Sequence, residues 1–171
     1  MTTDTIKLYT KYNSHANSLM NKIISQLTPS EWEKEFGGYY KSVKSLCSHL
    51  YTADFNWLKR FGSVRAFNFL NNRVFEKVYA RGDIPFNEIN EYLDKRNELD
   101  RAFESFAEEL TDDDFGKTLR YKSFKGEDQS RNLGGVLLHM LNHQTHHRGM
   151  ISLYLELLGR ENDFANLIVL V

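Results

Sequence analysis

Residues 138–149 read Leu138-His139-Met140-Leu141-Asn142-His143-Gln144-Thr145-His146-His147-Arg148-Gly149, and they hold four of the six histidines of the chain. The segment continues without proline to residue 158, so we predict one long helix here. Each residue of an α-helix turns the chain by about 100°. The spacing of the histidines therefore gives the direction of each side chain.

Two of these histidines lie on the apolar stripe of the predicted helix. We take the direction of His143, which is on the stripe, as 0° on the helical wheel. His147 then lies at about 40°, near the middle of the stripe. His139 and His146 lie to one side of it, at roughly −40° and −60°. The apolar members of the stripe are Val136, Met140, Met150, Ile151, Tyr154 and Leu158. We therefore expect His143 and His147 to face the protein interior.

Two imidazoles four residues apart on one buried stripe can bind a single metal ion, as in other helical His-x-x-x-His sites. An imidazole removed from water needs a hydrogen bond or a metal, so two on the same stripe require an explanation. The spacing leaves other readings open. His143 and His147 can form a hydrogen-bonded pair, or one of them can reach water at the helix end.

The composition is that of an ordinary globular protein. The chain has 171 residues, which suits one domain over residues 1–171, with 41% hydrophobic and 26% charged residues. The formal net charge of −1 and the lack of a basic stripe argue against binding to nucleic acid or to an anionic membrane.

We expect a cytoplasmic location. The single cysteine, Cys47, cannot form an intrachain disulfide, suits a reducing compartment and is predicted to be a packing residue. The N-terminal residues lack the basic and apolar regions of a signal peptide. No apolar stretch approaches the roughly 20 residues of a membrane helix.

Hydrophobic periodicity predicts an all-α four-helix bundle. We expect its long helices at about 5–27, 39–61, 86–110 and 133–158, with a short helical turn at Pro29-Ser30-Glu31-Trp32. Residues 63–85 are expected to form a long connection with a short helix, and such connections often close over a site. Residues 115–129 are expected to form a hairpin or an extended crossover before the last helix.

Several local features have simple expected roles. Asp4 or Thr5 is expected to cap the first helix, and Ser130 or Asn132 the last. Thr111-Asp112-Asp113-Asp114 can suggest a cation site, but a solvated loop or a cap fits this spacing better. Arg81-Gly82-Asp83 reads as a turn, and the apolar residues 164–171 should pack on the bundle or on another subunit.

Two segments of the chain form a recognisable pair. One is Ser45-Leu46-Cys47-Ser48-His49-Leu50-Tyr51, followed by Asp54 and Trp57. The other is the segment 138–149, with the pattern His-x-x-His-His-Arg-Gly. Together they resemble the DinB-like (DinB/YfiT-like) metalloenzyme family, and the second pattern is close to a family signature. The resemblance implies a metal site of one histidine from the second long helix and two from the fourth. In this chain these are His49, His143 and His147.

One position departs from the family pattern. Met150 stands where the family often has glutamine after Arg-Gly, which puts in doubt any polar contact of that glutamine but not the ligands. His146, His139, Asp54 and Tyr154 are candidates for contacts around the ligands or with substrate.

Three neutral imidazoles suit zinc or nickel and leave at least one open position, as in catalytic sites. The resemblance implies a thiol S-transferase that uses a low-molecular-weight thiol, or a metal-dependent hydrolase. Two alternatives remain: a metal-binding module without catalysis, and a plain helical bundle that forms a homodimer. Bound metal without a substrate pocket would favour the first, and absence of metal the second.

Overall fold

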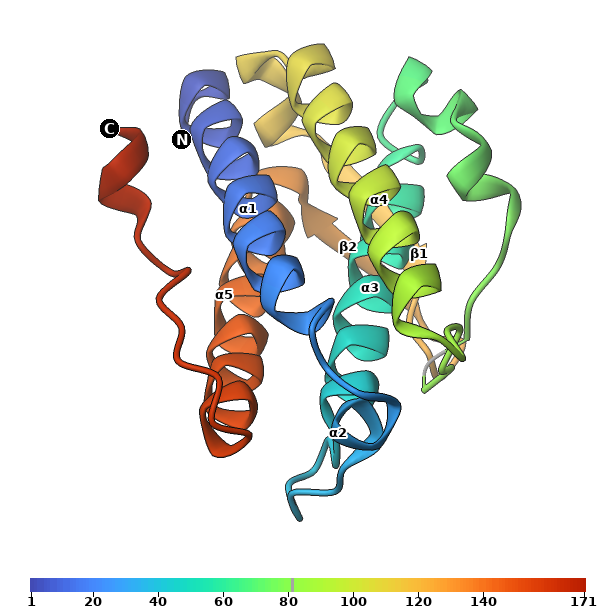
Figure 1. Cartoon of the computed structure of the whole chain (residues 1–171). Helices are drawn as coiled ribbons and strands as arrows, with labels where there is room; N and C mark the ends of the chain where they lie inside the picture. The colour runs from blue at the N-terminus through green and yellow to red at the C-terminus, as the bar shows by residue number, and fades with distance from the viewer. Residues whose placement is uncertain (81) are drawn as a thin grey trace.

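Four long helices form the bundle in the computed structural model, which describes residues 1–80 and 82–171. The all-α four-helix fold expected from the sequence is confirmed. Figure 1 shows the long helices side by side, and they pack mainly as two pairs, α1 with α4 and α3 with α5. The long helices are α1 (Thr3–Ile24), α3 (Val43–Phe61), α4 (Ile89–Glu109) and α5 (Leu133–Leu157).

Short elements connect these helices. The predicted helical turn is α2 (Pro29–Glu33), and the long connection contains two short 3-10 helices, η1 (Asn68–Asn71) and η2 (Arg73–Glu76). Asn56 of α3 donates a hydrogen bond to the carbonyl oxygen of Tyr79, so the connection is fastened to α3. The predicted turn at 81–83 includes Arg81, which lies outside the described residues.

Capping side chains decide where α3 and α5 begin. Ser42 and Ser45 form a reciprocal box, in which each hydroxyl accepts the backbone N–H of the other at 3.1 and 2.9 Å. Helix α3 therefore begins at Val43, and the expected start at residue 39 was wrong. Asn132 caps α5 by accepting the Gly135 N–H at 3.0 Å.

The caps and ends of α1 and α4 also differ in part from expectation. The N-cap of α1 is Thr2, whose hydroxyl accepts the Thr5 N–H at 3.3 Å, and not Asp4 or Thr5. Helix α1 ends at Ile24, about one turn earlier than expected. Helix α4 begins at Ile89, after its N-cap Glu88.

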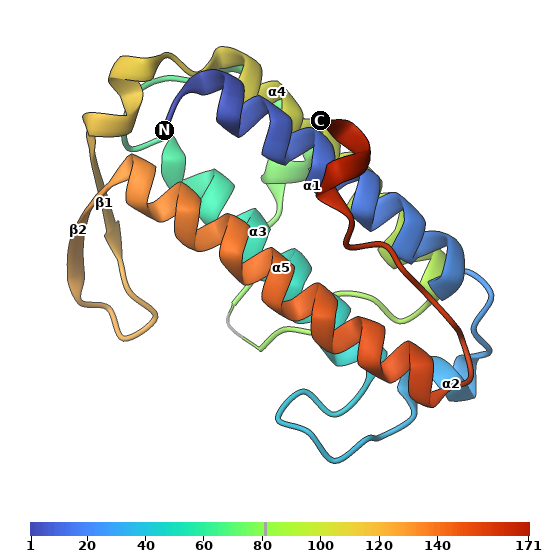
Figure 2. The ribbon, with the colours of Figure 1, turned by 90° about the vertical axis from the view of Figure 1, so that its left-hand side faces the viewer.

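The predicted hairpin is present. Strands β1 (Thr118–Lys122) and β2 (Asp128–Asn132) pair antiparallel, and Leu119 on β1 is fully buried. Figure 2 shows the hairpin beside the N-terminal end of α5. Because α5 starts directly after β2, the hairpin fixes the entry of the helix that carries the histidine segment.

The buried face of α5 differs from the predicted apolar stripe. Leu137, Leu141, Gln144, Arg148 and Leu155 are buried, although none of them was assigned to the stripe. The buried face centres near Gln144, about 100° round the helix from His143. His143 consequently lies at the edge of the core. Because Gln144 and Arg148 on this face are polar, the hydrophobic pattern of the sequence did not indicate that the face is buried.

Cys47 and the C-terminal tail have packing roles of different extent. Cys47 is fully buried, and burial raises the pKa of its thiol to about 12, so it is a packing residue as expected. In the tail, Phe164 is buried and the Tyr12 hydroxyl donates to the Ala165 carbonyl oxygen, but Val171 is exposed. Over the described residues, no helix has the length and apolar character that crossing a membrane requires.

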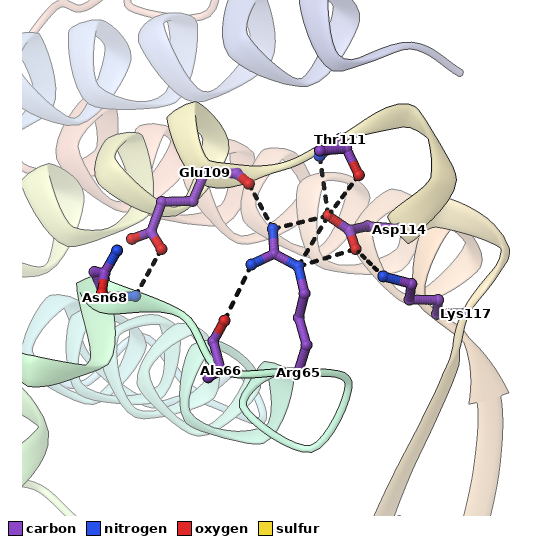
Figure 3. Close-up of polar contacts among 7 residues, drawn as sticks. All are labelled: Arg65, Ala66, Asn68, Glu109, Thr111, Asp114 and Lys117. Atoms are coloured by element: carbon purple, nitrogen blue, oxygen red, sulfur yellow. Dashed lines mark hydrogen bonds and ion pairs between the residues drawn. The ribbon is translucent and has the colours of Figure 1, made fainter.

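Asp114 joins the connection after α3 to the segment after α4 (Figure 3). Its fully buried carboxylate accepts hydrogen bonds from Arg65 Nε at 3.0 Å and Arg65 Nη2 at 2.9 Å. Lys117 Nζ donates at 2.7 Å and the Thr111 N–H at 2.9 Å. Within the predicted acidic loop, Asp114 is therefore a buried cap and not a solvated residue. Burial raises the pKa of Asp114, but these hydrogen bonds outweigh it and hold the pKa well below its ordinary value.

We expect Asp114→Asn to destabilise the fold by about 3 kcal/mol at pH 7, since it removes one partner of a buried ion pair. A carboxyl whose pKa is depressed by folding contributes stability above its unfolded pKa of about 4 and loses it as the pH falls below that value. Urea unfolding at pH 7 and pH 3 checks this. The deficit of the variant should shrink at pH 3, and a deficit independent of pH would contradict the role assigned to the charge.

Candidate metal centre

Three histidines from two helices meet at one point of the bundle. His49 comes from the middle of α3, and His143 and His147 come from successive turns of α5. One ring nitrogen from each can be chosen so that the three atoms lie within 4.8 Å of one another. The Nε2 atoms of His49 and His143 are 3.1 Å apart. The structure thus brings together the three histidines that the family resemblance selects.

This geometry fits three ligands of one small divalent ion. At metal–nitrogen distances of 2.0–2.1 Å, tetrahedral ligands lie about 3.3 Å from each other, close to the separation of His49 and His143. In addition, the Nδ1 atoms of His143 and His147 are buried and have no hydrogen-bond partner within the described part of the chain. A ring that binds a metal through Nε2 presents its Nδ1 to a second polar group, so these two atoms indicate a water or another outside partner beside the ligand set.

The two histidines that α5 contributes to the cluster, His143 and His147, are neutral at physiological pH. Burial, and to a smaller extent the neighbouring His139 and His146, lowers the pKa of His143 to about 4. Burial, then the proximity of His143 and His49, lowers the pKa of His147 to about 3. Neutral imidazole carries the lone pair that binds a metal.

The loop of residues 36–40, which carries several aromatic side chains, covers His49. The ring of Tyr40 stacks on His49 at 4.3 Å and meets His147 edge-on at 5.4 Å. The Tyr154 hydroxyl donates to the Tyr40 carbonyl oxygen at 2.8 Å, and the Tyr154 ring stacks on Phe36 at 4.4 Å. Tyr154, a sequence candidate, therefore acts on the histidines through the loop. Tyr40 was missed as a site residue, because it was placed at the start of the helix predicted at 39–61 and not in a loop.

A cavity of about 220 Å³ opens beside the histidines. His49, His143 and His139 line it, together with Asn56, Trp57 and Arg60. A larger cavity of about 480 Å³ shares Trp57 and His139 with it. His139, expected to lie near the ligands, is thus a wall residue between two cavities. The cavity therefore adjoins the histidine cluster on this side.

Two further candidates lie in different places. His146 is exposed, and its ring contacts that of His147 at 4.9 Å. Asp54 is fully buried and accepts a hydrogen bond from Arg96 Nη1 at 2.8 Å, in an ion pair between α3 and α4. Its charge is therefore paired with arginine within the core of the bundle.

The ion pair of Asp54 belongs to a buried polar network that the sequence reading missed. Arg96 also donates to Asp100 at 2.6 Å, and Asp100 accepts from Asn17 of α1 at 3.0 Å. Arg148 of α5 donates to Asn13, which completes a link across all four long helices. The sequence signal for it is Asn13, Asn17 and Asn21, which recur every four residues on one face of α1.

Comparison with known proteins gives one family. The model of the DinB family matches residues 1–168. Protein DinB of Bacillus subtilis (strain 168) is 24% identical over 153 residues, which cover 90% of this chain and 85% of that protein.

Two solved structures have a similar fold. A DinB-like protein from Bacillus cereus ATCC 10987 matches with a TM-score of 0.61 and 18% identity, covering 88% of this chain and 91% of that one. YfiT from Bacillus subtilis, described as a probable metal-dependent hydrolase with an unusual four-helix bundle topology, matches with a TM-score of 0.65 and 17% identity. The match covers 88% of this chain and 86% of YfiT. At these identities the structures support the fold alone.

Proposed function

Because the chain belongs to the DinB family, we propose that it is a metal-dependent enzyme acting on a small molecule, with His49, His143 and His147 holding one divalent ion. The observation that carries the proposal is the meeting of three ligand nitrogens within 4.8 Å at the edge of a cavity. A buried histidine pair without metal would not require His49 to approach from another helix.

Three imidazoles favour zinc or nickel, and three protein ligands leave a position for substrate. A divalent ion bound there would supply Lewis acidity to a water or a thiol. Side chains around the ion would position its ligands and contact the substrate. Tyr40 holds the His49 ring in place by stacking on it, and His139 offers an imidazole in the cavity wall that can exchange a proton with substrate.

Hydrolysis and thiol transfer are both compatible with this site. The description of YfiT as a probable metal-dependent hydrolase supports hydrolysis, and the affinity of zinc and nickel for thiolates supports thiol transfer. A panel of activated esters and amides, and separately a low-molecular-weight thiol with an aryl halide, should be tested with zinc-loaded, nickel-loaded and chelator-treated protein. Turnover only in the loaded protein, with one of the two panels, supports the enzyme proposal. Bound metal without turnover in either panel favours the non-catalytic module.

We expect Tyr154→Phe to weaken metal affinity by up to about tenfold. The change removes the hydrogen bond to the Tyr40 carbonyl oxygen but keeps the ring that stacks on Phe36. Outer contacts of metal ligands have effects of about 10- to 100-fold, and this one acts indirectly. Competition with a chromogenic zinc chelator measures the affinity. Tyr39→Phe is the matched control, because the Tyr39 side chain is 84% exposed, and an equal loss in both variants would contradict this role.

The remaining expectations stay predictions. They are the homodimer, the cytoplasmic location, the low-molecular-weight thiol partner and the lack of nucleic-acid binding. Light scattering tests the first by comparing the mass in solution with the 20.1 kDa of one chain. A dimer that contains no metal, even after incubation with zinc and nickel, would favour the structural bundle over the enzyme.

A further inference from the structure

We propose that Arg60 binds a carboxylate at the far end of the small-molecule substrate, so that the site selects elongated, singly charged anions. This inference rests on the proposed function, because it places the reacting end of the substrate at His49 and His143. Three observations support it: the position of Arg60 on α3, the groups that its guanidinium contacts, and the charges of the residues that line the cavity.

Arg60 shares one face of α3 with His49. The two residues are eleven positions apart, which is about 20° on the helical wheel and about 16 Å along the axis. Ala53 and Asn56 lie on the same face between them. All four line the cavity beside the histidines. A molecule that reaches from the histidines to Arg60 therefore follows the helix for a distance on the order of 10 Å, since the long arginine side chain leans back toward the N-terminus.

The guanidinium of Arg60 is held by aromatic rings. Its centre lies 4.7 Å from the ring of Trp57, 4.7 Å from that of Tyr121 and 5.1 Å from that of Phe124. Arg60 Nη2 donates to the Lys122 carbonyl oxygen at 3.4 Å. These contacts orient the planar fork before any ligand binds, which reduces the entropy lost on binding.

No carboxylate balances this cation within the described residues. Among the described arginines, Arg65, Arg73, Arg96 and Arg160 each have an aspartate or glutamate within 4.0 Å. Arg60 has none, like the exposed Arg101, Arg120 and Arg131 and the buried Arg148, but Arg60 lines the cavity beside the histidines. Burial lowers the pKa of Arg60, although an arginine remains charged at physiological pH. A half-buried cation without a counter-ion is the expected state of a residue that receives its anion from a ligand.

The cavity walls exclude competing negative charge. Among the described residues, those lining the 220 Å³ cavity include no aspartate or glutamate, and the same holds for the adjoining 480 Å³ cavity, where Arg131 adds a cation. A divalent ion with three neutral ligands would add further positive charge. The planar fork of a guanidinium matches the two oxygens of a carboxylate.

The alternative is a purely structural role, in which Arg60 only connects the hairpin to α3 through the Lys122 carbonyl oxygen and the aromatic rings. This role and substrate binding make different predictions. A purely structural Arg60 affects folding stability but not the choice between a charged and an uncharged ligand of equal length. Ligand discrimination is therefore the quantity to measure.

The test uses the full chain loaded with cobalt(II), whose visible absorption reports thiol binding at the metal. The probes are 3-mercaptopropionate, 6-mercaptohexanoate and 8-mercaptooctanoate, each compared with the hydroxyl-terminated thiol of the same length. We expect the longer acids to bind about tenfold more tightly than the matched alcohols, and Arg60→Met to remove this preference while the cobalt spectrum is retained. Arg60→Lys should keep part of it. Arg120→Gln, which removes an exposed charge from the same hairpin, should keep all of it.

Equal affinity of acids and alcohols in the wild type, or a preference that survives Arg60→Met, would overturn the proposal. If the wild-type protein binds no cobalt, the proposed function fails, and a second measurement on the metal-free chain decides the role of Arg60. The side-chain Nε–H resonance of Arg60, assigned by its absence in Arg60→Met, should shift with hexanoate and not with hexanol. No shift with hexanoate counts against the carboxylate site.

Discussion

Replacing His147 with alanine is expected to abolish metal binding, with a loss of affinity of more than about 100-fold. The wild-type chain should carry about one zinc or nickel ion. His147 lies within the histidine cluster, with its ring 4.3 Å from that of His143 and 4.6 Å from that of His49. Removing a partner outside the ligand set already costs about 10- to 100-fold, so the loss of one of three ligands should cost more. His49→Ala and His143→Ala should have the same effect.

Elemental analysis checks this on protein purified without chelator or histidine tag, before and after incubation with zinc and nickel. His15→Ala is the matched control, because His15 is exposed on α1, and His139→Ala should also retain the metal. Equal loss from His139→Ala and His147→Ala would show that the metal occupies a different face of α5. Circular dichroism of each variant separates loss of a ligand from loss of the fold.

The sequence was sufficient for the fold and for two of the three histidines of the cluster. His143 and His147 follow from the helical spacing alone, because residues four apart on a helix point in the same direction. His49 was assigned through the family resemblance, since no local pattern says which of the other helices approaches α5. That information is tertiary, and the packing of α3 against α5 supplies it.

Two features of the site were not predicted from the sequence, and each has its own physical cause. Hydrophobic periodicity predicts that polar residues lie on the exposed face of a helix, but Gln144 and Arg148 lie on the buried face of α5. Arg148 is accommodated there because it donates to Asn13, which is itself buried. Hence the predicted stripe was rotated, and His143 was placed deeper than it lies. Tyr40 was missed for another reason: it was placed at the start of the helix predicted at 39–61, whereas α3 begins at Val43 and Tyr40 lies in the loop before it.

The polar network also bears on the position of the metal centre in the bundle. Asp54 and His49 are five residues apart on α3, so one faces α4 while the other faces α5. Two polar layers therefore use different sides of the same helix. We infer that the network of Arg96 fixes how the four helices pack, and that the histidines depend on this packing.

Replacing Arg96 with methionine is expected to destabilise the fold by about 3–5 kcal/mol at pH 7.5. Methionine keeps most of the volume but leaves the carboxylates of Asp54 and Asp100 buried without their cation. Urea unfolding measures the loss. Arg101→Met is the matched control, because Arg101 is exposed on the same helix, and its effect should stay within about 0.5 kcal/mol.

The pH dependence of Arg96→Met distinguishes lost charge pairing from a packing defect. Burial raises the pKa of Asp54 and of Asp100, and the Arg96 guanidinium opposes that rise, so both pKa values should increase further in the variant. Carboxyls whose folded pKa is raised bind more protons in the folded state, so stability falls as the pH rises. The variant should therefore regain stability between pH 7.5 and pH 5, relative to the wild type. Adding Asp54→Asn and Asp100→Asn should restore most of the loss and remove this pH dependence, because the buried charges are then absent. A deficit that is unchanged by pH and by these two substitutions would mean that Arg96 stabilises the bundle through packing alone.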